Sequence, residues 1–212
     1  MRSITETLRT PCAAVLVTVL AGVLAAACSS GPPAPDGSAP LEEIAEWREA
    51  RDELFAEDSS IVPVERREAL LPIPYYPPDL SYRAPAVLRL ADTREVAEMP
   101  TSTGTLRRME RVGNLEFTLG GETLTLGAFV EYGTQRIESL FVPFADLTTG
   151  EETYDAGRYL DIEPTVSGLY TIDFNYAYNP NCAYSDLYEC PFPPPSNRLK
   201  VAIRAGERAP GA

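Results

Sequence analysis

Apolar and polar residues alternate through much of the second half of the chain. The clearest stretch surrounds Gly120-Gly121, where every other position is apolar: Leu115, Phe117, Leu119, Leu124 and Leu126. Alternation with a period of two around a pair of glycines predicts two antiparallel strands joined by a tight hairpin turn. With Gly113-Asn114 interpreted as a second tight turn, residues 105–131 are predicted to form a three-stranded antiparallel meander.

Further strands are expected in four places, at residues 86–90, 137–144, 168–175 and 199–204. Before them, apolar residues recur at helical spacing over residues 41–57. Pro40 immediately precedes this stretch, and Glu42-Glu43 lie at its start. Proline in the first turn, followed by acidic residues, is typical of a helix start. We therefore expect an all-β domain, an antiparallel sandwich or small barrel of about eight strands, preceded by one N-terminal amphipathic helix.

Prolines interrupt the chain between these two parts. Residues 61–85 contain six prolines and the pair Tyr75-Tyr76. Because proline removes a backbone donor, this segment is predicted to be extended or looped and to form no central strand. The predicted β-rich domain spans residues 58–209.

The first residues have the features of a secretion signal. A basic start with Arg2 and Arg9 precedes fifteen uncharged, mostly apolar residues at 13–27, too short to cross a hydrocarbon core of about 30 Å. The segment ends Leu24-Ala25-Ala26-Ala27-Cys28, which resembles a bacterial lipoprotein signal. We predict a signal peptide over 1–27, a lipid on Cys28, and a flexible tether over 28–40, so that the chain is exported and anchored to the outer face of the cell membrane.

Charge narrows the partners that this chain can have. Residues 28–212 keep 16 of the 18 basic residues and 30 of the 31 acidic ones, a net charge of −14. So acidic a chain has no electrostatic footprint for nucleic acid, and its expected membrane contact is the lipid. The chain has no histidine, which excludes Ser-His-Asp and Cys-His catalysis. No cofactor and no metal site are predicted.

Two cysteines remain once Cys12 leaves with the signal and Cys28 carries the lipid. Cys182 and Cys190 form one pair, and an oxidising compartment favours a disulfide between them. A thiolate metal site is the alternative, but such sites need three or four nitrogen or sulfur ligands. The enclosed loop and the residues after it hold Tyr184, Tyr188 and Phe192 among four prolines, which fits a lid, a binding edge or a plug.

The order of motifs over residues 141–207 resembles a known family. The segments are Phe141-Val142-Pro143-Phe144-Ala145-Asp146, Gly157-Arg158-Tyr159-Leu160, Asp173-Phe174-Asn175, Ala177-Tyr178-Asn179-Pro180, Cys182-Ala183-Tyr184, Asn197-Arg198-Leu199 and Ala205-Gly206-Glu207. In this order they resemble the bacterial family called domain of unknown function 1684. The resemblance extends more loosely back to Tyr75-Tyr76-Pro77 and implies a shared fold, but no activity.

Seven polar residues in these segments are candidates to bind a ligand: Asp146, Tyr154, Arg158, Asp173, Asn175, Tyr178 and Asn179. Arg158 fits a clamp for a carboxylate or phosphate, or else an internal ion pair with Asp146 or Asp173. Asp146 also fits a turn. Asp173 and Asn175, with Tyr178 and Asn179, fit a polar, aromatic-rimmed patch for sugar or amide recognition. The alternative is that the two asparagines tie down the proline-rich segment.

These observations favour a non-catalytic binding or interaction module whose partner is a small ligand or an envelope component. A hydrolase that pairs Glu207 with Asp146 or Asp173 is the second hypothesis. Two carboxylates are easily found among so many acidic residues, so the second hypothesis has less support. A purely structural envelope protein is the third.

Overall fold

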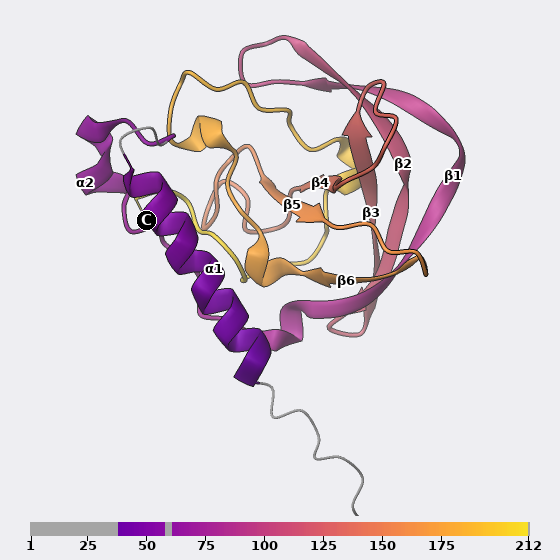
Figure 1. Ribbon diagram of the computed structural model, residues 1–212, viewed down its shortest axis with the longest axis horizontal. Helices are drawn as coiled ribbons and strands as arrows, with labels where there is room; N and C mark the ends of the chain where they lie inside the picture. Colours follow the sequence, from indigo (N-terminus) through magenta and orange to yellow (C-terminus); the bar gives the residue numbers. More distant parts are fainter. Residues whose placement is uncertain (1–37, 58–60, 212) are drawn as a thin grey trace, which may run out of the picture. The chain divides into compact units, whose positions relative to one another are not determined.

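A six-stranded antiparallel sheet, curved into a half-barrel, forms the centre of the structure (Figure 1). The computed structural model describes residues 38–57 and 61–211. The strand order is β5-β4-β3-β2-β1-β6. The strands are β1 (Arg83–Pro100), β2 (Leu106–Leu119), β3 (Glu122–Glu131), β4 (Leu140–Phe144), β5 (Arg158–Ile162) and β6 (Leu169–Asp173). The expected antiparallel β-fold with one N-terminal helix is confirmed, but the expected number of about eight strands is wrong: six are present in the described residues.

The prediction of three strands over residues 105–131 is wrong: the range forms two strands, β2 and β3, because only one of the two expected turns is present. Gly120 and Gly121 make the tight β2–β3 turn, with φ angles of +58° and +85° that favour glycine. Gly113 makes no turn, because β2 runs straight through it and pairs it with Leu90 of β1 and Ala128 of β3. A Cβ atom at Gly113 would stand 2.2 Å from the carbonyl oxygen of Arg89, so glycine is needed there for a close approach of strands.

The strand expected at residues 199–204 is absent. Leu199 and Ile203 are buried as an alternating pattern requires. However, the backbone of this segment bonds to a turn and to side chains instead of to a strand: the amide of Leu199 donates to Ala145, and the carbonyl of Ile203 accepts from the Arg158 guanidinium. Burial on alternate positions therefore arose here without a ladder of strand pairing.

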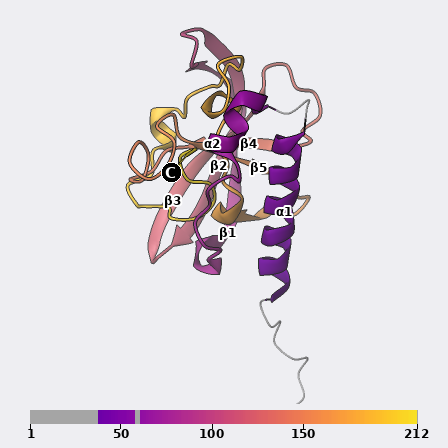
Figure 2. The same cartoon turned by 90° about the vertical axis from the view of Figure 1, so that its left-hand side faces the viewer.

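Helix α1 (Ser38–Ala56) begins where Pro40 and the acidic residues predict. It lies on the loop-rich side of the half-barrel, away from β2 and β3, with its N-terminal end near the start of β1 (Figure 1; Figure 2 gives the view turned by 90°). Its inward face carries residues at helical spacing: Ile44, Trp47, Arg48, Arg51, Asp52 and Phe55. No helix within residues 38–57 and 61–211 is long and apolar enough to cross a membrane.

Short helical turns connect the remaining segments. They are α2 (Arg67–Leu70) and the 3₁₀ turns Val64–Arg66, Leu80–Tyr82, Phe174–Tyr176, Asn181–Ala183 and Pro195–Asn197. Residues 61–82 form no strand, as their prolines predict. The same prediction is wrong for residues 83–85, which begin β1 between β2 and β6, with Pro85 opposite Thr171 of β6.

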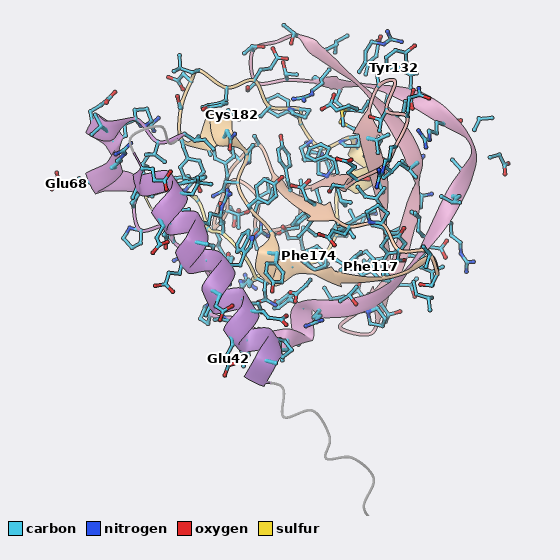
Figure 3. All side chains as sticks on the ribbon, viewed as in Figure 1. Glu42, Glu68, Phe117, Tyr132, Phe174 and Cys182 are labelled. Carbon is cyan, nitrogen blue, oxygen red and sulfur yellow. The ribbon has the colours of Figure 1, made fainter. Side chains whose placement is uncertain are left out.

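The main hydrophobic core fills the concave side of the sheet. It joins side chains of β2, β3 and β4 to Phe174 and Ile203 from the irregular part of the chain. The rings of Phe117 and Phe174, labelled in Figure 3, lie 5.8 Å apart within it. A second cluster packs Phe55 of α1 against Tyr184, with ring centroids 5.0 Å apart. The helix and the loop that begins at Asn181 are thus held together by apolar burial.

Candidate functional site

A cavity of about 550 Å³ opens between the ends of the strands and the loop at residues 180–191. The sheet contributes Met109 from β2, Phe141 from β4, and Tyr159 and Asp161 from β5. The loop contributes Asn181, Tyr188, Glu189, Cys190 and Pro191, and Tyr178 lies between the two sets. A space of this size holds a small organic ligand.

Three aromatic rings stack edge to face along the wall of the cavity. The ring centroids of Phe141 and Tyr159 lie 4.7 Å apart, and those of Tyr159 and Tyr178 lie 5.8 Å apart. Burial raises the pKa of the Tyr159 and Tyr178 hydroxyls well above the usual tyrosine range. Both hydroxyls therefore stay protonated and donate hydrogen bonds: Tyr159 to the carbonyl of Pro191 at 2.6 Å and Tyr178 to Asp161 Oδ2 at 2.6 Å.

Charged side chains line the rest of the cavity, and most of them are acidic. Its four carboxylates belong to Glu131, Glu138, Asp161 and Glu189, and its two guanidinium groups to Arg107 and Arg136. Arg107 is already paired with Glu131 across strands β2 and β3. The lining therefore carries a net negative charge, which disfavours anionic ligands.

The loop that edges the cavity is attached to the β1–β2 hairpin. Ser102 donates its amide to the carbonyl of Cys190 at 3.0 Å and accepts the amide of Cys190 on its hydroxyl at 3.2 Å. The Glu189 carboxylate accepts from the hydroxyls of Thr103 and Thr105, at 2.6 Å and 2.8 Å. These hydrogen bonds, that of Thr103 foremost, lower the pKa of Glu189 below its usual range. These hydrogen bonds attach the loop, which was predicted to be a lid or a binding edge, to the β1–β2 hairpin.

Asp146 and Arg158 form a sealed ion pair instead of lining this cavity. Arg158 Nη2 lies 2.8 Å from Asp146 Oδ2, and the two side chains are 1% and 0% exposed. The same guanidinium donates to the carbonyls of Ile203, Ala205 and Glu207. Of the two interpretations of Arg158, the geometry favours the internal ion pair.

Asp173 and Asn175 do not share an open face. Asn175 is fully buried in the 3₁₀ turn after β6, and its side chain bonds both the amide and the carbonyl of Asp79, each at 2.9 Å. Asp173 caps that turn and lines a cavity of about 280 Å³. Asp79 belongs to the proline-rich segment, so Asn175 ties that segment to the sheet, as the alternative interpretation anticipates.

Asn179 belongs to a second buried network, whose centre is Glu207. The fully buried Glu207 carboxylate accepts from the amide of Asn179 at 2.7 Å and from the hydroxyl of Tyr184 at 2.8 Å, and it pairs with Arg51 of α1. The Arg51 guanidinium also lies over the Tyr178 ring, 5.0 Å from its centroid. The polar contact that joins the helix to the domain therefore reaches the back of the cavity wall.

Tyr178 is the one of the seven predicted ligand-binding residues that lines the 550 Å³ cavity. Tyr154 lines two smaller cavities nearby, of about 300 and 380 Å³. Sequence reasoning did not single out Phe141, Tyr159 or Asp161 as ligand contacts. Phe141 and Tyr159 belong to the motifs that carry the family resemblance, which was the available signal for these two residues.

The predicted disulfide is not formed in this structure, where Cys182 and Cys190 are both thiols. They are nevertheless in contact, because the amide of Cys182 donates to Cys190 Sγ at 3.2 Å. Cys28 lies outside the described residues. Within those residues no group of three or more histidine, cysteine, aspartate or glutamate side chains is placed to hold a metal ion.

Comparison with known proteins gives a family and a related structure. A family model described as a protein of unknown function (DUF1684) matches residues 69–208. A solution NMR structure of an uncharacterized protein from Haloarcula marismortui is 39% identical to this chain, with a TM-score of 0.65. The match covers 82% of this chain and 96% of that one. No curated protein matches.

Proposed function

This chain belongs to the family of proteins of unknown function DUF1684, and on that premise we propose that it is a ligand-binding module whose binding site is the 550 Å³ aromatic cavity. One observation carries the proposal: an open cavity of ligand size has a wall of edge-to-face aromatic rings and a rim of hydrogen-bonding groups. Apolar walls with a few placed polar groups are typical of small-molecule sites.

The chemistry of the lining indicates a neutral, polar ligand with an apolar face. The Tyr188 ring at the rim offers a surface for stacking, while Asn181 and Asp161 offer donors and acceptors. The excess of carboxylates disfavours phosphates and carboxylic acids. An acetamido sugar combines these requirements, because it has hydroxyls, an amide and ring C–H groups that pack on aromatic faces.

The geometry gives less support to a hydrolase. Two of the carboxylates considered for acid–base work, those of Asp146 and Glu207, are buried and paired with Arg158 and Arg51. A carboxylate held in this way by its own chain has no room for a substrate or a water molecule between it and its partner. The binding module is therefore the function that the site supports best.

The test of binding uses two disaccharides and a pair of tyrosine variants. Di-N-acetylchitobiose carries the amide and cellobiose lacks it, and calorimetry of each with the full chain gives the affinities. Tyr188→Ala removes a rim ring that is 36% exposed, and Tyr132→Ala removes a ring that is 50% exposed and lies outside the cavity lining.

We expect chitobiose to bind more tightly than cellobiose. Loss of one stacking ring weakens binding about fivefold, from roughly 1 kcal/mol. Tyr188→Ala is expected to show this loss, and Tyr132→Ala to bind like the parent. If neither sugar binds the parent protein, the ligand class is wrong; if both variants bind equally well, the cavity is not the site.

We also propose that the module is exported and held at the membrane by a lipid on Cys28. The support is the signal-like sequence at residues 1–27 and the start of α1 at Ser38, which leaves a short Gly-, Pro- and Ser-rich segment as tether. Fractionation of cells expressing Cys28→Ala tests this. The variant should leave the membrane fraction, and its retention there would show that the anchor is assigned wrongly.

A further inference from the structure

Cys182 and Cys190 face each other with unequal surroundings at the edge of the aromatic cavity. Cys182, labelled in Figure 3, lies on the 3₁₀ turn Asn181–Ala183 and is partly exposed. Cys190 is buried at 5% exposure and lines the cavity. Cys182 is thus the more exposed residue of the pair, and Cys190 is the buried one.

A hydroxyl group lies close to the sulfur of Cys182. The Tyr154 hydroxyl is 4.0 Å from it and donates to it. Hydrogen bonds to the charged form of a group favour that form. With the Cys190 thiol as the largest contribution, they lower the pKa of Cys182 to about 7, while the same contact raises the pKa of Cys190. Cys182 is therefore the better nucleophile of the pair at neutral pH.

The loop keeps its place without a covalent bond between the two sulfurs. On the Cys190 side, Phe192 donates its amide to the carbonyl of Pro100 at 2.7 Å, and Ser102 bonds the backbone of Cys190 twice. On the Cys182 side, the hydroxyl of Tyr184 donates to the buried Glu207. Because both limbs are anchored by hydrogen bonds, the pair can change oxidation state while the fold persists.

We propose that Cys182 and Cys190 form a redox-active dithiol that exchanges with disulfides, with Cys182 as the attacking thiol and Cys190 as the resolving thiol. The Cys182 thiolate attacks one sulfur of a disulfide substrate, forms a mixed disulfide and releases the first substrate thiolate. Cys190 then loses its proton and attacks the Cys182 sulfur. This step closes the Cys182–Cys190 disulfide and releases the second substrate thiolate, which takes up the proton. The substrate gains the two electrons that the dithiol loses.

The sequence predicts a disulfide, and the structure contains two thiols. A redox-active pair accounts for both, because the disulfide is its oxidised state and the two thiols are its reduced state. A disulfide with a purely structural role requires no difference in exposure or surroundings between its two sulfurs. Here the sulfur of Cys182 is partly exposed and accepts from the Tyr154 hydroxyl, while Cys190 is buried.

The test follows each cysteine of the reduced full chain separately, by alkylation with iodoacetamide and mass spectrometry of the peptides. At pH 7 we expect Cys182 to react more than tenfold faster than Cys190, since a thiol with a pKa of about 7 is half ionised there, whereas an ordinary thiol with a pKa of about 8.5 is only a few per cent ionised. Equal rates would overturn the proposal.

Oxidised glutathione is the disulfide probe for the two steps. The Cys190→Ser variant is expected to stop at a mixed disulfide on Cys182, and Cys182→Ser to form none at Cys190. The parent chain should end as an internal disulfide and return to the dithiol in excess reduced glutathione. A parent chain that stays oxidised under those conditions holds a structural staple only, and the proposal fails.

Tyr154→Phe tests the donors around Cys182 independently of the cysteines. It keeps the ring and removes the hydroxyl that lies 4.0 Å from the sulfur. The pH profile of Cys182 alkylation should move to higher pH, while Tyr188→Phe, the same chemical change in the loop that holds Cys182 and Cys190, leaves it in place. An unchanged profile for Tyr154→Phe would contradict the assigned contact. None of these thiol readouts depends on sugar binding, so the two proposals fail or stand separately.

Discussion

At the Asp146–Arg158 pair, the carboxylate and the guanidinium are enclosed by their own chain, whereas at the aromatic cavity the polar groups stand open beside apolar rings. The side chains of Asp146 and Arg158 are at most 1% exposed, and Arg158 donates to three carbonyls in residues 203–207. Asp161 and Tyr188 lie at the surface of a 550 Å³ space. The charged motif that stands out most in the sequence thus stabilises the fold, and less conspicuous residues form the opening.

The largest effect is expected from breaking the sealed pair. Arg158→Met leaves the Asp146 carboxylate buried without its counter-charge and removes the donor to three carbonyls. We expect the free energy of unfolding in urea to fall by about 3–5 kcal/mol. Arg204→Met breaks an ion pair with Glu152 whose arginine is 56% exposed, and it should leave the free energy of unfolding nearly unchanged. Similar small losses in both variants, with loss of chitobiose binding in the first, would make Arg158 a ligand contact.

Neutralising Glu207 is expected to have the next largest effect. Glu207→Gln keeps the shape of the side chain but leaves Arg51 of α1 unpaired and weakens the bond from Tyr184. A hydrogen bond to a charged group contributes roughly 1.5–3 kcal/mol, so a loss of about 2 kcal/mol in the urea experiment is expected. Chitobiose affinity should change little. A stability equal to that of the parent would show that Arg51 does not attach the helix.

A change at the cavity is expected to act in the opposite way. Asp161→Asn removes the charged acceptor of the Tyr178 hydroxyl at an exposed position. Unfolding should change by less than about 1 kcal/mol, and chitobiose affinity measured by calorimetry should fall several-fold. Asp186→Asn is the control, because Asp186 is exposed in the loop at residues 180–191 and does not line the cavity. Equal affinities in the two variants would remove Asp161 from the site.

The smallest effect concerns pH. Hydrogen bonds from Thr103 and Thr105 lower the pKa of Glu189 in the folded protein. The stability from this contact is therefore fully present above the ordinary glutamate pKa of about 4.3 and is lost as the pH falls through the lower folded value. Amide NMR signals of Thr103 and Thr105 should move over that acid range, and Glu189→Gln should abolish the transition. A transition that persists in the variant belongs to another group.

Local patterns predicted the elements that depend on near neighbours. Pro40 and the acids after it located the start of α1, and Gly120-Gly121 located the β2–β3 turn, because both signals act within a few residues. Gly113 was misinterpreted because its cause is non-local: the backbone at Arg89, 24 positions away, approaches too closely for a Cβ atom. A glycine kept for space and a glycine kept for a turn look alike in a sequence.

The candidate site was harder to predict than the fold. Arg158 and Asp146 were correctly considered as partners, because an isolated charge beside a buried strand needs one. The cavity wall joins Phe141, Tyr159 and Tyr178 to a loop seated on Ser102. These residues come together because the loop packs back against the β1–β2 hairpin. No spacing of residues in the sequence predicts such a contact. The segment at 199–204 failed as a strand for a related reason, since the guanidinium of the distant Arg158 satisfies the carbonyl of Ile203.

The most direct test of the contrast between the two regions is amide NMR of the labelled full chain titrated with di-N-acetylchitobiose. Our account expects the shifts to gather at Tyr159, Tyr178 and Tyr188, with the signals of Asp146 and Arg158 unmoved. Shifts centred on Asp146 and Arg158, or none at saturating sugar, would contradict it.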